Sequence, residues 1–362
     1  MVKGLRKSLI LSCVLALFLP SVASADMNVS RIAGANRYET AMKVQQKYFT
    51  KASGNLAVLA SGTDFRTALY GSYMANALKV PFYAIPNTGM SRVMLDELKR
   101  TNVKNAYIMG NDKILNNSIN NSLKSIDIKY KRFHDQVKIQ DGYNYFSDRL
   151  SSMVDWTIFS TFNEGYARGD ISCNIIVNDT KFPDLLSSVP FTSTLAREQK
   201  MGLVGYNSSK SEYLGSDGYG FIIGGYDSVP ESIKTGSIFD NEGLGLYYHS
   251  SVDPDGIFFE SYTGRIAGQN RYKTAIEIAK AYKPVLKRSI DTVVLVDGTN
   301  YPDALASGTV ATMNNGAILL TEPGKLNEDT KAFIQENNIQ NVIIVGGEKS
   351  VSKNVENELR GL

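Results

Sequence analysis

The stretch "RIAGANRYETA" at residues 31–41 returns as "RIAGQNRYKTA" at residues 265–275, with nine of the eleven positions identical. The two copies lie 234 residues apart, and agreement at this level indicates a duplicated unit rather than chance. Such a unit sets the fold class, because each copy must form the same elements in the same order. The residues that follow each copy should therefore match as well.

The match does continue beyond both copies. Residues 56–72, "LAVLASGTDFRTALYGS", align with residues 292–308, "TVVLVDGTNYPDALASG", and residues 106–123 align with residues 342–359. We call the repeated eleven-residue stretch the phrase. The offset is 236 residues in both alignments, close to the 234 residues that separate the two copies of the phrase. The first and last hundred residues after the N-terminal leader are thus two copies of one module.

The middle of the chain carries the same landmarks in a diverged form. Residues 175–188, "IIVNDTKFPDLLSS", align with residues 294–307 and keep the Pro-Asp pair. Further on, "FIIGGYDSVPESI" at residues 221–233 aligns with residues 343–355. The order of these landmarks predicts a third copy of the module between the other two.

The opening phrase of this middle copy is the hardest part to recognise. We interpret "KIQDGYNYFSD" at residues 138–148 as its remains, with Tyr145 at the position of Tyr272 and both arginines lost. The expected organisation is a leader at 1–25 and modules at 26–130, 131–260 and 261–362. The second module has diverged most.

The third copy predicts its elements most clearly. Asn270 is a typical N-cap, and apolar side chains follow at the spacing of one helix face, namely Tyr272, Ala275, Ile276 and Ala279. Buried strands are expected at residues 292–296, 317–320 and 341–345. Helix starts are expected at Pro302, at Asn327, and at Ser350 or Ser352.

Strands that alternate with helices in this way predict right-handed crossovers and a parallel sheet covered on both faces. The expected fold class is α/β, with three tandem, small, doubly wound modules. A sheet of three strands has two exposed edges, so we expect the three modules to pack around a shared centre.

The N-terminal segment predicts export. Lys3, Arg6 and Lys7 precede an apolar run, and small residues end it, a pattern typical of a secretory signal peptide cleaved after Ala25. Without this leader the chain has 36 basic and 36 acidic side chains, which argues against nucleic acid or an anionic membrane as partner. No later apolar run reaches the roughly 18 residues of a membrane span. We expect a secreted protein of the cell wall or cell surface, attached non-covalently.

The repeated sequences resemble a known family. The phrase R-I-A-G-x-N-R-Y-x-T-A, the segment D-G-x-x-Y-P-D-A-L-A at residues 297–306 and the V-G-G turn at residues 345–347 are similar to the cell wall-binding repeat 2 family of Gram-positive surface proteins. The resemblance implies Rossmann-like modules in a pseudo-threefold arrangement. It also implies that the protein, like S-layer and other anchored surface proteins, binds an anionic cell-wall polysaccharide.

The family associates binding with a short Pro-Ile-Leu-Leu motif in one strand. In the third module the motif falls on Ala317, Ile318, Leu319 and Leu320, with alanine in place of proline. In the first module it falls on Pro81, Phe82, Tyr83 and Ala84, and only the proline is kept. The nearest candidates in the second module are residues 201–204. These departures argue against three equivalent polymer sites.

Two interpretations of the arginines in the phrase remain open. Guanidinium groups make paired contacts to phosphate or carboxylate, so these side chains are candidates for contact with an anionic polymer. They could equally pair with a carboxylate such as Asp303 where two modules meet, and so fix how the modules pack. The four side chains are Arg31, Arg37, Arg265 and Arg271.

Several enzyme and cofactor readings fit less well. The glycine pairs at 224–225 and 346–347 follow strands, but neither the G-x-G-x-x-G spacing nor a Walker lysine is present. His134 and His249 lie in unrelated contexts, which argues against a zinc amidase, and Cys173 lacks the surroundings of a catalytic thiol. We predict a binding protein with no enzyme activity, cofactor or metal.

Two alternatives remain. One is a cell-wall hydrolase of the amidase type, or a modifier of such an enzyme. The other is a protein interaction module of the surface layer, with other surface-layer proteins as partners, because residues 206–248 are rich in tyrosine and glycine.

Overall fold

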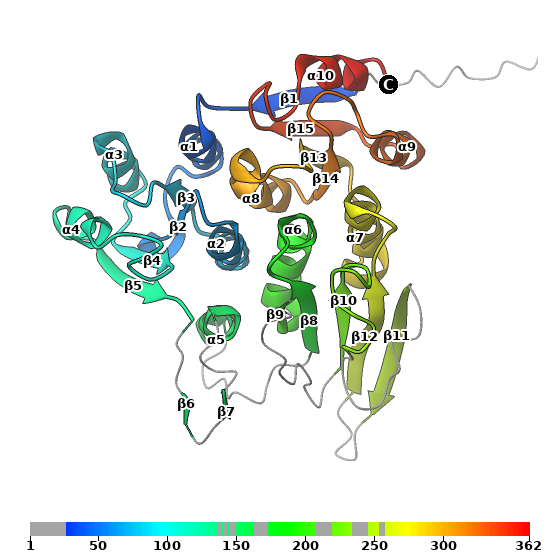
Figure 1. Ribbon diagram of the computed structural model, residues 1–362, viewed down its shortest axis with the longest axis horizontal. Coiled ribbons are helices and arrows are strands. Elements are labelled where there is room, and N and C mark those ends of the chain that lie inside the picture. The colour runs from blue at the N-terminus through cyan, green and yellow to red at the C-terminus, as the bar shows by residue number, and fades with distance from the viewer. Residues whose placement is uncertain are drawn as a thin grey trace, which may run out of the picture.

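The computed structural model describes residues 27–135, 139–140, 143–144, 150–162, 173–207, 219–233, 245–252 and 258–362. Three largely parallel sheets surround a group of central helices, and further helices cover the outer faces of the sheets (Figure 1). The fold class is therefore α/β, with small Rossmann-like units in a pseudo-threefold arrangement, as the sequence predicts. Within these described residues, no helix is long and apolar enough to cross a membrane.

The first sheet has the order β3-β2-β4-β5, and all its strands are parallel. Its strands are β2 (Leu56–Ser61), β3 (Phe82–Ile85), β4 (Asn105–Met109) and β5 (Lys129–Phe133). The helices of this part are α1 (Arg37–Tyr48), the 3-10 turn η1 (Ser53–Asn55), α2 (Phe65–Leu78), α3 (Arg92–Arg100) and α4 (Ser118–Lys124). Asn36 caps α1 and Asp64 caps α2, each by accepting backbone N–H groups, so both helices begin where short polar side chains allow it.

The second sheet has the order β11-β12-β10-β8-β9, and only β11 runs antiparallel to its neighbour. Its strands are β8 (Cys173–Asn178), β9 (Met201–Tyr206), β10 (Tyr219–Ile223), β11 (Gly245–Val252) and β12 (Phe258–Ile266). The helices are α5 (Leu150–Phe162) and α6 (Phe182–Gln199), and β6 (Ile139–Gln140) pairs with β7 (Tyr143–Asn144) in a separate hairpin. Much of the tyrosine-rich segment, including residues 208–218, and Tyr145 lie outside the described residues.

The third sheet has the order β1-β15-β13-β14 and is parallel throughout. Its strands are β1 (Asn28–Ile32), β13 (Thr292–Asp297), β14 (Ala317–Thr321) and β15 (Asn341–Val345). The helices are α7 (Arg271–Leu286), the 3-10 turn η3 (Pro302–Ala306), α8 (Ser307–Met313), α9 (Glu328–Glu336) and α10 (Lys353–Arg360). The predicted caps Asn270, Asn327 and Ser352 each accept a backbone N–H of the helix they open.

The strand before each phrase belongs to the sheet of the preceding module. β5 leads into the second module but pairs with β4, and β12 leads into the third module but pairs with β10. β1 closes the series, because it leads into the first module and pairs with β15 near the end of the chain. The three sheets are thereby linked in a ring, and the first and last strands of the described residues lie side by side.

The central helices α2, α6 and α8 pack against one another with small side chains at their contacts. Gly308 illustrates the closeness: a Cβ atom there would lie 2.6 Å from Val189 Cγ1 and 2.8 Å from Ser72 Oγ. Ser188, Ser193 and other small residues of α6 are completely buried. Close packing of three backbones around the axis therefore depends on residues with little side chain.

Candidate functional site

The first arginine of the phrase binds the glycine turn of the preceding module. Arg31 Nη1 donates to the carbonyl oxygen of Gly346 at 2.8 Å, and Arg265 Nη1 donates to that of Gly224 at 2.7 Å. Arg132 in β5 makes the same contact with Gly110 at 3.1 Å. The expectation that both arginines are lost from the second copy is therefore wrong for the first of them.

The second arginine of the phrase binds a glycine of its own module. Arg37 Nη1 donates to the carbonyl oxygen of Gly62 at 2.7 Å, and Arg271 Nη1 donates to that of Gly298 at 2.6 Å. Both glycines follow the first strand of a module, so this contact ties the helix start to the carboxyl edge of the sheet. Arg271 remains exposed on its outer side.

The aspartates of the two Pro-Asp pairs hold a serine of the following turn. Asp303 Oδ2 accepts from Ser350 Oγ at 2.6 Å, and Asp184 Oδ2 accepts from Ser228 Oγ at 2.9 Å. Burial raises the pKa of Asp184. The carboxylate partner predicted for the arginines is therefore not Asp303; for Arg31 it is Glu356 of α10, at 3.0 Å.

Three regions thus meet wherever two modules join. They are the start of a helix, a glycine turn, and the loop of the phrase that precedes the next helix. We call these places the first, second and third junction. The first junction joins residues 64–67 and 110–112 to Asp135; the second joins residues 181–184 and 225–228 to residues 268–271; and the third joins residues 301–303 and 346–350 to residues 34–37.

The second junction contains a cavity of about 790 Å³. The exposed ring of Tyr226 and the half-buried rings of Phe65 and Phe182 are apolar parts of its wall. Lys181 and Arg271 bring positive charge to it. Two carboxylates, Asp184 and Asp227, also line it. The remaining lining residues are uncharged: Thr180, Pro183, Gly225, Ser228, Gly268, Gln269, Asn270 and Thr274.

This cavity, which we call the groove, lies at the carboxyl ends of β8, β10 and β12. Ligands of parallel α/β folds bind at that edge. Aromatic faces beside amide, hydroxyl and guanidinium groups suit a sugar that carries an acidic substituent. The arrangement can therefore bind and orient such a sugar. Among the described residues, no three His, Cys, Asp or Glu side chains are grouped to hold a metal ion.

Three aromatic rings meet on the pseudo-threefold axis, one from each module. The ring centroids of Phe65 and Phe182 are 6.3 Å apart, those of Phe65 and Tyr301 are 5.5 Å apart, and those of Phe182 and Tyr301 are 5.8 Å apart. The Tyr301 hydroxyl also donates to the carbonyl oxygen of Thr63 at 3.0 Å. We call these rings the aromatic triad. It connects the groove to the centre of the molecule.

The residues of the strand motif lie in the core. Ile318, Leu319 and Leu320 of β14 have no exposed surface, and β14 packs against α7 and against α6 of the second module. Ala317 is 1 % exposed, Pro81 and Phe82 are buried, and Tyr83 is 5 % exposed. A surface ligand has no direct access to these side chains, and their arrangement fits packing between modules. A role for them in polymer binding remains a prediction.

Sequence reasoning missed two components of these junctions. Arg132 lies within the lysine-rich strand β5, and its offset of 133 from Arg265 matches no other pair in the alignment, so its place in the phrase is hidden in the sequence. Tyr226 follows a glycine turn and lines the groove together with Arg271. Only the pairing of β10 with β12 brings these two residues together.

A family model described as "Cell wall binding domain 2 (CWB2)" matches residues 31–120 and 265–356. Among curated proteins, N-acetylmuramoyl-L-alanine amidase LytC of Bacillus subtilis (strain 168) is 25 % identical over 352 residues, which cover 96 % of this chain and 60 % of the amidase. The amidase enhancer of the same organism is 24 % identical over 336 residues, which cover 91 % of this chain and 40 % of that protein. The matches thus span less than two thirds of either relative.

Two solved structures share the fold. Cwp6 from Clostridium difficile superposes with a TM-score of 0.66 at 17 % identity, covering 92 % of this chain and 48 % of that one. Cwp8 from the same organism gives a TM-score of 0.65 at 14 % identity, covering 92 % of this chain and 51 % of that one. At these identities the likeness concerns the arrangement of the elements.

Proposed function

Because this chain belongs to the cell wall binding domain 2 family, we propose that it is a secreted protein that attaches non-covalently to the cell wall by binding an anionic wall polysaccharide. The single observation that carries the choice of ligand is the groove at the second junction. It combines three aromatic rings with Lys181 and Arg271 at the edge of a sheet where ligands bind. On this proposal the protein binds the wall polysaccharide reversibly, because the described residues of the groove supply non-covalent contacts.

The contacts expected of each part of the groove follow from its chemistry. Arg271 has one nitrogen committed to Gly298 and an exposed face, so it is placed to pair with a phosphate or carboxylate. Tyr226 is 41 % exposed and can stack on a sugar ring. Each contact is modest in strength, so retention on a wall would depend on several contacts to one polymer.

Co-sedimentation with purified Gram-positive cell-wall sacculi tests this function. The chain from Asp26 onward is mixed with intact sacculi and with sacculi from which the anionic polymer has been extracted. We expect retention on the intact walls that is lost after extraction. Equal retention on both preparations would show that the ligand is peptidoglycan or another component, and no retention would reject the anchoring role.

A second candidate comes from the likeness to an amidase, and the same purified chain addresses it. Release of soluble fragments from peptidoglycan would identify a hydrolase, whereas a change in the rate of a separate amidase would identify a modifier. We favour the binding role, because the cell wall binding family model matches both the first and the third module. A third role, contact with other surface-layer proteins, would appear as co-assembly with such proteins in the absence of sacculi.

A further inference from the structure

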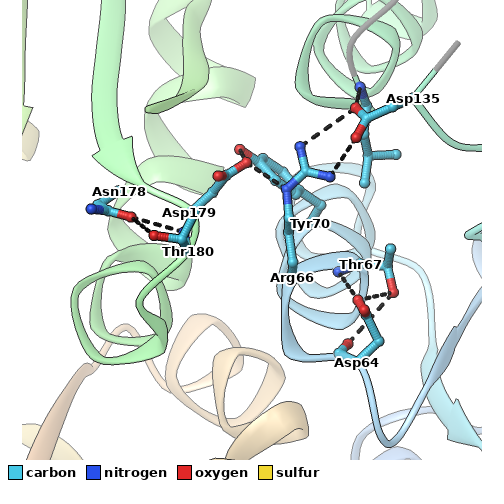
Figure 2. A network of polar contacts seen from close by, with 9 residues as sticks. Asp64, Arg66, Thr67, Tyr70, Asp135, Asn178, Asp179 and Thr180 are labelled. Atoms are coloured by element: carbon cyan, nitrogen blue, oxygen red, sulfur yellow. Dashed lines mark hydrogen bonds and ion pairs between the residues drawn. The ribbon is translucent and has the colours of Figure 1, made fainter. Parts of the chain in front are cut away.

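The first junction carries a cluster of charged side chains at the place where the second junction has its groove. Arg66 Nε lies 2.6 Å from Asp179 Oδ2, and Arg66 Nη1 lies 2.7 Å from Asp135 Oδ2. Figure 2 shows the guanidinium of Arg66 between the two carboxylates, with Tyr70 beneath it. The Tyr70 hydroxyl donates to Asp179 Oδ2 at 3.3 Å, and the ring lies 5.6 Å from the guanidinium carbon. We call this group the Arg66 clasp.

Each charged member of the clasp replaces an uncharged residue of the other junctions. Arg66 aligns with Pro302, and Asp179 aligns with Gly298, the glycine that holds Arg271. Asp135 lies three residues after Arg132, as Gly268 lies three residues after Arg265. The side chains of Arg66 and Asp135 thus fill positions where the second junction has a proline and a glycine that line its groove.

The charge of the clasp also opposes an anionic ligand. Its single guanidinium already has two carboxylate partners, so the clasp has a formal charge of minus one. Asp179 Oδ1 is buried and has no hydrogen-bond partner, which leaves an uncompensated acceptor at this position. An anionic sugar placed there would meet carboxylate oxygens, and like charges at contact distance disfavour binding. The Asp135 carboxylate is further held by the backbone N–H of Leu150 at 2.8 Å.

The third junction, in contrast, keeps three hydrogen-bond contacts of the second. Asp303 binds Ser350 as Asp184 binds Ser228, and the backbone N–H of Gly34 donates to Thr40 Oγ1 at 2.9 Å as that of Gly268 donates to Thr274 Oγ1 at 3.1 Å. Arg37 binds Gly62 as Arg271 binds Gly298. The guanidinium groups of Arg37 and Arg271 therefore stand in equivalent positions.

We infer that the anionic ligand binds at the second and third junctions, with Arg271 and Arg37 as its cationic contacts, and that the Arg66 clasp has converted the first junction into a closed structural contact. This inference rests on the proposed function and assigns its ligand to two of three homologous places. The molecule would then have one face that binds the polymer, centred on the third module, and one side that only holds two modules together.

The test measures retention on intact sacculi for three matched arginine variants of the chain from Asp26 onward. Arg271→Ala and Arg37→Ala should each lower retention on the order of tenfold, because each removes charge-assisted contacts to the ligand. Arg66→Ala should leave retention within twofold of the parent while lowering the melting temperature. Arg92→Ala controls for the loss of one positive charge, since its side chain is 94 % exposed on α3. Circular dichroism establishes the temperature range in which each variant is folded.

Arg66→Lys is a second variant of the clasp, which keeps the charge and is used if the alanine variant fails to fold. Loss of retention in a folded Arg66 variant equal to that of Arg271→Ala would overturn the inference, because the first junction would then bind ligand. Full retention by both Arg271→Ala and Arg37→Ala would also overturn it, while the anchoring role would stand. Absence of retention in the parent chain would reject the anchoring role itself, and this inference with it.

Discussion

Single arginines in this molecule have two uses at once. Arg271 and Arg37 each donate from one nitrogen to a backbone carbonyl oxygen, and this hydrogen bond fixes the start of a helix. A guanidinium carries five N–H donors, so such a contact leaves others for a ligand. The structural and the binding interpretations of these residues are therefore compatible, whereas Arg265 is 1 % exposed and binds the carbonyl oxygens of Gly224 and Val229.

We expect an unusual pH dependence from Asp155 of α5, a buried acid that accepts from neutral donors. Its carboxylate accepts from the Tyr73 hydroxyl at 2.7 Å and from the Leu203 N–H at 2.9 Å. Burial nevertheless raises its pKa well above the ordinary value. The folded state therefore holds this proton more tightly than the unfolded state, and the stability gained from protonation is lost as the pH rises through the folded pKa.

We expect Asp155→Asn to remove this loss. Between pH 4 and pH 7, the free energy of unfolding of the parent should fall by more than that of Asp155→Asn, at about 1.4 kcal/mol for each pH unit over which the carboxyl is protonated in the folded state and ionised in the unfolded state. Urea unfolding at the two pH values measures the difference. Asp155→Ala is the control, because it also removes the titrating carboxyl but strands the hydroxyl of Tyr73, so its free energy of unfolding should lie about 2 kcal/mol below that of the Asn variant at both pH values. An unchanged pH slope in the Asn variant would contradict the assignment.

For Glu356 we expect the opposite pH dependence of the free energy of unfolding. Its carboxylate accepts from Arg31, Lys353 and Arg360, and hydrogen bonding to Lys353, together with the other two, lowers its pKa to about 2. Its stabilising contribution is therefore present above its ordinary pKa of 4.5 and is lost as the pH falls toward 2. Glu356→Gln should cost about 2 kcal/mol at pH 7, after allowance for solvent screening of Lys353 and Arg360.

Urea unfolding from pH 7 downward measures this cost, and the gap from the parent should narrow once the pH falls below 4.5. Glu358→Gln in the same helix is the matched control, because Glu358 accepts a hydrogen bond from the neutral Asn354 amide. It should change the free energy by less than about 0.5 kcal/mol. An equal cost for both variants would show that the effect is one of general helix charge.

At the scale of elements, β1 is a strand that stabilises a module other than its own. It pairs with β15 from Asn28↔Asn341 to Ile32↔Val345, and Arg360 donates to the carbonyl oxygen of Val29 at 2.8 Å. A chain that begins at Ala33 should therefore leave the first sheet intact and expose one edge of the third. Amide hydrogen exchange in β15 should accelerate about tenfold or more, while exchange in β4 stays unchanged. Ser30→Ala, which keeps the strand, is the control, and equal acceleration in both strands would contradict this assignment.

The elements that the sequence predicts best are those with a uniform local pattern. Strands 292–296, 317–320 and 341–345 are β-branched or aliphatic runs, and the structure places β13, β14 and β15 there. The strands before the phrases were missed, because "NVSRI" and "KYKRF" mix polar and apolar residues as edge strands do. The segment after Pro302 was expected to be an α-helix, but it begins as the 3-10 turn η3 and becomes α-helical only at Ser307.

The candidate site was predictable in its parts and not in its assembly. Arg37, Arg271 and Asp303 were recognised because they repeat. Their partners depend on which strand of one module enters the sheet of another, and no local pattern encodes that choice. The same limit explains the strand motif, whose residues are recognisable in sequence although β14 buries them against a helix of another module.

At the scale of the whole molecule, the aromatic triad couples the three modules. Phe65→Ala and Phe182→Ala should each lower the free energy of unfolding by about 1–2 kcal/mol, since the rings are only half-buried. The double variant should cost less than the sum by about 0.5–1.5 kcal/mol, because the two rings contact each other. Urea unfolding measures this cycle. Phe65→Ala combined with Val93→Ala, a residue 60 % exposed on α3, should be additive, and additivity in both cycles would exclude coupling through the triad.

The pairing of β1 with β15 also has a consequence for the order in which the molecule can be completed. β1 is made early, yet its partner Asn341 follows Asn28 by 313 residues. A chain interrupted before β15 would leave its first strand without a neighbour and its ring open. Contacts over such a separation form late and slowly, because a long loop must close first. Resistance of β1 to proteolysis would therefore report that β15 is present and paired with it.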